Sequence, residues 1–491
     1  MNESCVAVAT ERCSRPGLIK ARLAWHPSLG LPHPHPLPED VKLSRFLTPP
    51  YAFDYFTDHE ELVIAEPPVE PISSYRDESG YTTWRNDSPL RGESGGGWPP
   101  GHPLPLPEWD DPGWGPSPTP EHPAEGRAGR GPGQVPGTGP AGRGRPTVRL
   151  ATVLDYEDLA ARVEHTTQQL LRDHNYNTVG NFLRFYSAYA QRKDRDVNRL
   201  FREYQPPITA AHHTCVGLGL TLVRQLAALG HAGLRDALHL VSCEEAIENP
   251  AAYLSAAPVA STAEKEHVLV SARLDIGGRK GVLLLDPGYH VARVVTVMED
   301  GMYPHTGWFT QSDEPEVRRE YMYTLSPDGK YVLWTVRETR AERQSITVNL
   351  VYIERAYLSA VDVTERRNIA YNFRSLLARN TKGQLTAGVY FPMAVVTAEG
   401  GPACTIFYTE VKGGATLKRR VKIPFHHLLD PTQELSVEQD LALVMCSQQL
   451  GMHDDQLEEV LTKVASVMAD TTFMTQILDI NNAIEEMSDE N

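Results

Sequence analysis

Half of the 60 residues from position 88 to position 147 are proline or glycine, and this stretch limits where a fold can begin. A segment with so few aliphatic side chains cannot bury enough apolar surface to offset the entropy lost on ordering. We therefore predict that residues 1–147 are mostly disordered and Pro/Gly-rich, and that the folded chain begins at residue 148. One segment with several aromatic residues, 43–64, could instead dock onto the folded part or onto a partner.

Charge and cysteine content exclude several protein classes. The formal net charge of the 491-residue chain is −16, which argues against a general nucleic-acid-binding protein. No run of residues approaches the roughly 18 apolar positions that a membrane span needs. The six cysteines include no CxxC pair, so neither a disulfide framework nor a zinc site is predicted. We expect a reducing, cytoplasmic setting, with no nucleic-acid, membrane or metal partner.

Apolar periodicity divides the rest of the chain into successive parts. We predict a helical part over 148–235, an antiparallel β-rich part over 236–430, a C-terminal helical part over 431–475 and an acidic tail over 476–491. Helices that precede and follow a block of strands, without alternating with them, are typical of an α+β fold. The predicted helices span 154–172, 181–204, 215–229, 436–450 and 454–471. The predicted strands span 239–242, 267–274, 280–286, 291–298, 320–325, 331–337, 346–354, 388–396 and 405–411.

Three short pieces of the chain supply a thiol, an imidazole and a carboxylate. Cys215 opens the Gly-rich helix that follows Thr214, His267 opens a strand, and Asp286 closes the next strand after a turn at 275–278. The unpaired N–H groups at a helix start favour negative charge, and hence a thiolate at Cys215. Antiparallel strands joined by a short hairpin would place Asp286 beside His267 and orient the imidazole. We predict that Cys215, His267 and Asp286 form a catalytic triad.

Each of these residues also has a purely structural interpretation. Cys215 could be packed as a small hydrophobic residue, His267 could be a satisfied core histidine, and Asp286 could be a turn residue in Asp-Pro-Gly. The order of the three along the chain, on a helix start and two consecutive strands, favours the triad. His212 and His213 lie beside Cys215, but no further ligand has metal-binding spacing, so no metal site is predicted there.

The stretch from His267 to Tyr289 has a strand start at His267, a turn at Gly277-Gly278, and Asp286-Pro287-Gly288-Tyr289 after the second strand. This arrangement resembles the arylamine N-acetyltransferases, in which a catalytic His begins a strand, a Gly-containing turn follows, and the catalytic Asp lies in an Asp-Val-Gly-Phe element. The family's catalytic Cys also opens a helix upstream of the His, as Cys215 does. It usually follows Arg-Gly-Gly, where this chain has His212-His213-Thr214.

The resemblance implies a papain-like, transglutaminase-like Cys-His-Asp core and an acyltransferase. Cys215 would accept an acyl group from acetyl-CoA or another acyl thioester, and His267 would then assist transfer to a small-molecule amine. Two alternatives stay open: a transglutaminase-like or amidase/protease-type cysteine enzyme with the same triad, and a catalytically inactive interaction protein that binds protein partners through its Pro-rich N-terminal region. His305, Trp308 and Phe309 are candidates to line an acyl pocket, or form a packed loop.

Overall fold

The computed structural model describes residues 62–64, 146–209, 212–255, 265–314, 317–341, 343–430, 432–453 and 455–489. The prediction of disorder for 1–147, and the Pro-rich segment proposed to bind partners, therefore lie almost entirely outside the described residues. The exceptions are residues 146–147 and strand β1 (Leu62–Ile64), which pairs with a strand of the folded part. Of the two alternatives for the segment 43–64, docking onto the folded part holds for these three residues.

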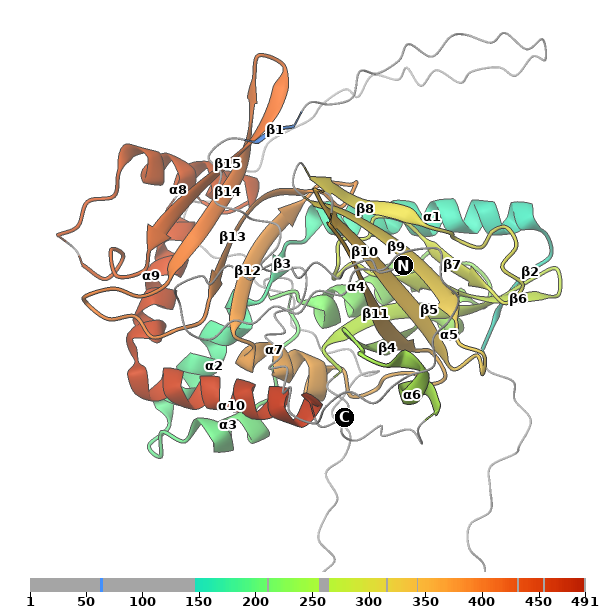
Figure 1. Cartoon of the computed structure of the whole chain (residues 1–491), viewed down its shortest axis with the longest axis horizontal. Helices are drawn as coiled ribbons and strands as arrows, with labels where there is room; N and C mark the ends of the chain where they lie inside the picture. The colour runs from blue at the N-terminus through green and yellow to red at the C-terminus, as the bar shows by residue number, and fades with distance from the viewer. Residues whose placement is uncertain are drawn as a thin grey trace, which may run out of the picture. The chain divides into compact units, whose positions relative to one another are not determined.

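The fold is α+β, as predicted, with two antiparallel sheets and C-terminal helices (Figure 1). The larger sheet has the strand order β7-β6-β5-β4-β11-β10-β9-β8, with β2 added parallel to β5. This sheet is curled, and it encloses a core that includes Leu269, Tyr321 and Trp334. Its strands are β2 (Val148–Leu150), β4 (His239–Glu244), β5 (His267–Ile276), β6 (Arg279–Leu285), β7 (Val295–Met298), β8 (Phe309–Glu314), β9 (Val317–Leu325), β10 (Tyr331–Arg340) and β11 (Arg343–Tyr352).

Strand β5 is apolar on both faces because both faces are covered. Leu269 lies in the core that the sheet encloses, whereas Val268 and Val270 pack on the other face with helices α1 (Val153–Asp173) and α4 (Cys215–Ala227). Helix α4 approaches the sheet closely, since a Cβ at Gly219 would lie 2.9 Å from a methyl of Leu240. A glycine at this position lets the start of α4 rest directly on the strands.

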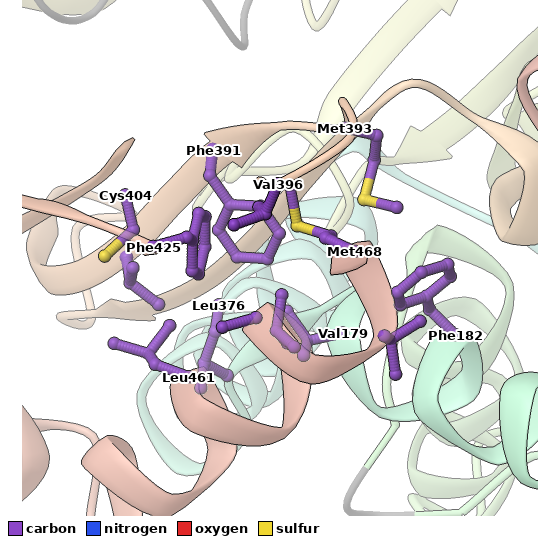
Figure 2. Packing of buried hydrophobic residues seen from close by; sticks show 14 of the residues in the cluster. Val179, Phe182, Leu376, Phe391, Met393, Val396, Cys404, Phe425, Leu461 and Met468 are labelled. Atoms are coloured by element: carbon purple, nitrogen blue, oxygen red, sulfur yellow. The ribbon is translucent and has the colours of Figure 1, made fainter. Parts of the chain in front are cut away.

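The smaller sheet has the order β1-β15-β14-β13-β12-β3 and is covered by helices from both ends of the described chain. Figure 2 shows part of the core between them, where Leu461 and Met468 of α9 lie among side chains such as Phe391 and Val179. The strands are β3 (Tyr176–Asn177), β12 (Phe373–Arg379), β13 (Leu385–Pro392), β14 (Ala403–Lys412) and β15 (Ala415–Pro424). The helices are α2 (Val179–Gln191), α3 (Val197–Glu203), α8 (Val437–Gln449), α9 (Gln456–Ala469) and α10 (Thr471–Asp489).

Several predicted boundaries differ from the structure, and three of the differences change what the segment forms. The single helix expected over 181–204 is two helices, α2 and α3, because Arg195 has a positive φ of 49° and Asp196 starts a new helix by accepting a hydrogen bond from the N–H of Arg199. The strand expected over 291–298 begins only at Val295, since 287–290 form a turn. The acidic tail expected over 476–491 is mostly helix α10, which buries Ile477 and Ile480.

Several elements had no counterpart among the predictions, among them strands β3, β8 and β12. Strand β12 contains the buried residues Arg374 and Arg379, and two arginines in seven residues obscure its strand pattern. A π-helical turn, η1 (Val361–Glu365), continues into the one-turn helix α7 (Arg366–Ala370) within the part expected to be β-rich. The short helices α5 (Leu234–Ala237) and α6 (Pro250–Ser255) complete the described elements. Among the described helices, none is both long and apolar enough to cross a bilayer.

Candidate active site

Cys215 is the first residue of α4, as expected from the sequence. Thr214 is the N-cap residue, in an extended conformation, and its hydroxyl oxygen accepts a hydrogen bond from the N–H of Val216 at 3.3 Å. An N-cap of this kind marks the start of the helix, so the next residue lies in the first helical turn. Cys215 is 2 % exposed, so its sulfur faces the protein interior at the positive end of the helix dipole.

His267 and Asp286 lie together at one end of the β5–β6 hairpin. The turn between these strands places Gly277 and Gly278 at positive φ, which fixes a register that pairs Val270 with Leu285. At the open end of the hairpin, His267 Nε2 is 2.9 Å from Asp286 Oδ1, and both side chains are buried. Because Nε2 is hydrogen-bonded to the carboxylate, Nδ1 is the ring nitrogen that can form a hydrogen bond with a thiol.

Gly288 brings Cys215 next to His267. A Cβ built at Gly288 would lie 2.7 Å from Cys215 Cβ and 2.7 Å from His267 Cε1, so Gly288 lies beside both residues and leaves no room for a side chain. Burial alone would lower the pKa of His267, but the Asp286 carboxylate and a hydrogen bond with Cys215 raise this pKa well above its ordinary value. The arrangement therefore favours an imidazolium beside the sulfur, which is the charge state that accompanies a thiolate.

Tyr289 covers the imidazole on another side. Its backbone N–H donates to Asp286 Oδ1 at 3.0 Å, and its ring lies edge-to-face on the His267 ring at 4.3 Å between centroids. Its hydroxyl donates to the Glu245 carboxylate. Tyr289 thus restricts both Asp286 and His267, and the Asp-Pro-Gly-Tyr segment supplies a carboxylate, a close-packed glycine and an aromatic cover within four residues.

A buried arginine holds this segment from the second sheet. Arg379 of β12 donates to the carbonyl oxygen of Pro287 at 2.9 Å, to that of His174, and contacts His290 Nδ1 at 3.1 Å. Burial lowers the pKa of Arg379 to about 9, and burial together with Arg379 lowers the pKa of His290 well below its ordinary value. The neutral His290 can therefore accept the hydrogen bond, and the loop that carries Gly288 is fixed between the two sheets.

The segment 361–370 contacts the residues just before both Cys215 and His267. Glu365, at the end of η1, accepts hydrogen bonds from the hydroxyl of Thr214 and, at 2.6 Å, from the side-chain amide of Asn181. Thr364 donates to the carbonyl oxygen of Lys265 at 2.7 Å. No local sequence pattern indicates this role, because the segment forms only two short helical turns and its partners lie about 100 to 180 residues away.

Glu365 is a buried carboxyl group at the start of the Cys215 helix. Its side chain is fully buried, and burial raises the pKa of Glu365 to about 7, although the hydrogen bonds from Thr214 and Asn181 oppose the shift. Both hydrogen-bond partners are neutral groups. Asn368, one turn further along, places its side-chain nitrogen 4.0 Å from Cys215 Sγ.

The two histidines before Cys215 lie in different environments. His213 is buried, and burial lowers its pKa to about 4, so its ring is neutral near pH 7. His212 accepts a hydrogen bond from the guanidinium of Arg184 at 2.7 Å. Within the described part of the chain, no three His, Cys, Asp or Glu side chains are grouped as metal ligands.

The residues expected to line an acyl pocket lie in a cleft apart from the triad. His305, Trp308 and Phe309 line a cleft of about 350 Å³ together with residues of α1 such as Tyr156, and none of the three triad residues belongs to its lining. The guanidinium of Arg337 packs over the Trp308 ring at 4.2 Å. The loop is therefore the wall of a separate cleft and not the acyl pocket that the sequence suggested.

Neither the known family models, nor the curated proteins, nor the solved structures contain a match to this chain. Any functional assignment therefore depends on the site itself. Its chemistry is that of a buried thiol whose neighbouring imidazole is oriented by a carboxylate.

Proposed function

We propose that this protein is an acyltransferase with a papain-like, transglutaminase-like core and that Cys215 is its nucleophile. The observation that carries the proposal is the hydrogen bond of 2.9 Å between His267 Nε2 and Asp286 Oδ1, with Cys215 on the other side of the same imidazole. In this arrangement His267 can take the thiol proton when Cys215 attacks, and Asp286 stabilises the resulting imidazolium.

The reaction would proceed in two acyl transfers. The Cys215 thiolate attacks the carbonyl carbon of an acyl thioester such as acetyl-CoA, and a tetrahedral oxyanion forms. When the oxyanion collapses, the bond to the donor sulfur breaks and His267 supplies a proton to the departing thiolate. An acceptor amine then attacks the carbonyl carbon of the acyl-cysteine, and His267 removes a proton from the amine. The bond between that carbon and Cys215 Sγ breaks, which releases the amide and restores the thiolate.

Burial of the triad favours transfer to an amine over hydrolysis. Cys215, His267 and Asp286 are 2 %, 4 % and 2 % exposed, respectively, so little bulk water reaches the sulfur. A site that excludes water protects an acyl-cysteine until an acceptor arrives. We place this chemistry in the reducing cytoplasm, because the thiol must stay free, and the described cysteines are all unpaired.

Alkylation tests the activated thiol. Purified protein would be treated with iodoacetamide between pH 5 and 9, and the modified cysteines located by mass spectrometry. Cys404 and Cys446 are matched controls, because both are buried and burial raises the pKa of each to about 12. We expect Cys215 to react at neutral pH while the two controls do not, and His267→Gln to abolish this selectivity.

Incubation with acetyl-CoA alone then tests the donor. An acetyl adduct on Cys215, absent from Cys215→Ala, would support the thioester donor. An activated Cys215 that gains no acetyl group would point to another acyl donor or to amide hydrolysis. If Cys215 is alkylated no faster than Cys404 and Cys446, the protein does not use Cys215 as a nucleophile.

A further inference from the structure

The tetrahedral oxyanion formed at Cys215 needs hydrogen-bond donors. The first backbone N–H groups of a helix have no partner within the helix, so the N–H of Cys215 itself is one available donor. The next N–H, that of Val216, donates to the Thr214 hydroxyl. A second donor from a side chain beside the sulfur would stabilise the oxyanion further.

Asn368 is the side-chain amide that reaches the sulfur. Its Nδ2 lies 4.0 Å from Cys215 Sγ, at the outer limit of a hydrogen bond to sulfur. The oxyanion forms on an oxygen that is two bonds from Sγ, so a donor at this distance can come within hydrogen-bonding range of it. Asn368 thus makes only a weak contact with the sulfur before the reaction. Its strong hydrogen bond, to the substrate oxygen, forms only when charge develops there, which is the condition for catalysis by differential binding.

Several buried contacts fix Asn368 in place. The guanidinium of Arg374, which is 1 % exposed, donates to the carbonyl oxygen of Asn368 at 2.6 Å and also to that of Ile369. The preceding π-helical turn is anchored by Glu365 to Thr214 and by Thr364 to Lys265. One rigid segment is therefore tied to the residues just before the nucleophile and before the base, as a preorganised donor requires.

We propose that Asn368 Nδ2 is an oxyanion donor of this site, which rests on the acyl-transfer function proposed above. The donor is a neutral amide, so it neither competes with His267 for the thiol proton nor adds a charge beside the thiolate. No sequence motif marks Asn368, because it lies 153 residues after Cys215 in a helix of five residues.

Two reagents separate oxyanion stabilisation from thiol reactivity. Iodoacetamide alkylates Cys215 by displacement at a saturated carbon, where no oxyanion forms. p-Nitrophenyl acetate acylates Cys215 through a tetrahedral oxyanion: the carbon–sulfur bond forms, the bond to the aryl oxygen breaks, and p-nitrophenolate leaves. The rates of both reactions would be measured for the wild-type protein, Asn368→Ala and Asn368→Leu, with Asn372→Ala as the control for an amide four residues further along the chain.

We expect both Asn368 variants to alkylate within about twofold of wild type and to acylate roughly 100- to 1,000-fold more slowly, whereas Asn372→Ala changes neither rate. Alanine and leucine are good helix formers, and leucine keeps the branching of the side chain at Cγ, so the segment should stay folded. Unchanged acylation in the two variants would overturn the proposal, and so would an equal loss of both rates, which would show a structural role. A wild-type Cys215 that reacts with neither reagent would instead remove the proposed function.

Discussion

Replacing Glu365 by glutamine should make the protein more stable at alkaline pH. One pKa unit corresponds to about 1.4 kcal/mol, so raising the pKa of Glu365 from 4.5 to about 7 makes its ionisation in the folded protein about 3 kcal/mol less favourable than in the unfolded chain. Glutamine has the same shape and stays neutral. Its amide can keep hydrogen bonds with Thr214 and Asn181, because the Thr214 hydroxyl can donate or accept.

The sign of the pH dependence follows from which state binds the proton more tightly. The folded state does, so the stabilisation from protonated Glu365 is complete below pH 4.5 and is lost as the pH rises through 7. Glu365→Gln has no such loss. Between pH 5 and pH 8 the difference in unfolding free energy between the variant and the wild type should therefore grow by about 2.5 kcal/mol.

Thermal unfolding followed by circular dichroism measures this difference. Unfolding entropy is about 2 cal/mol/K per residue, so for about 330 described residues the expected growth corresponds to roughly 4 °C in Tm between pH 5 and pH 8. Glu399→Gln is the matched control, because Glu399 is exposed and its carboxylate should be solvated in both states. A difference that stays constant with pH for Glu365→Gln, or that shrinks as the pH rises, would refute the reasoning.

Two further substitutions test packing at the site and in the core. Gly288→Ala places a methyl group 2.7 Å from atoms of Cys215 and His267, and should slow alkylation of Cys215 at least tenfold. The control is Gly307→Ala, whose new Cβ meets no atom within 4 Å and should leave the rate unchanged. Equal alkylation rates for the two variants would contradict the close packing at Gly288. Phe473→Ala removes a fully buried ring that packs against several aromatic side chains of α2. It should lower the free energy of unfolding, measured by urea denaturation, by about 3–5 kcal/mol. A loss under about 1 kcal/mol would show that the ring is not part of the core.

Local patterns in the sequence account for much of the fold around the candidate site. Thr214 before Cys215 predicts the helix start, and the turn at Gly277-Gly278 predicts the β5–β6 hairpin. These signals involve neighbours within a few residues, so a reading of the chain can detect them. The hairpin also explains why His267 and Asp286, 19 residues apart, lie within hydrogen-bond distance.

The sequence by itself therefore determined the α+β class, the start of the Cys215 helix and the pairing of the imidazole with its carboxylate. Tertiary structure alone decided that Glu365 and Asn368 lie at that helix start, that the arginines of β12 are buried, and that the cleft near Trp308 is separate from the triad. The physical reason is distance along the chain. A buried charge such as that of Arg379 is tolerated only where carbonyl groups from remote segments accept hydrogen bonds from it, and no local propensity shows which segments those are.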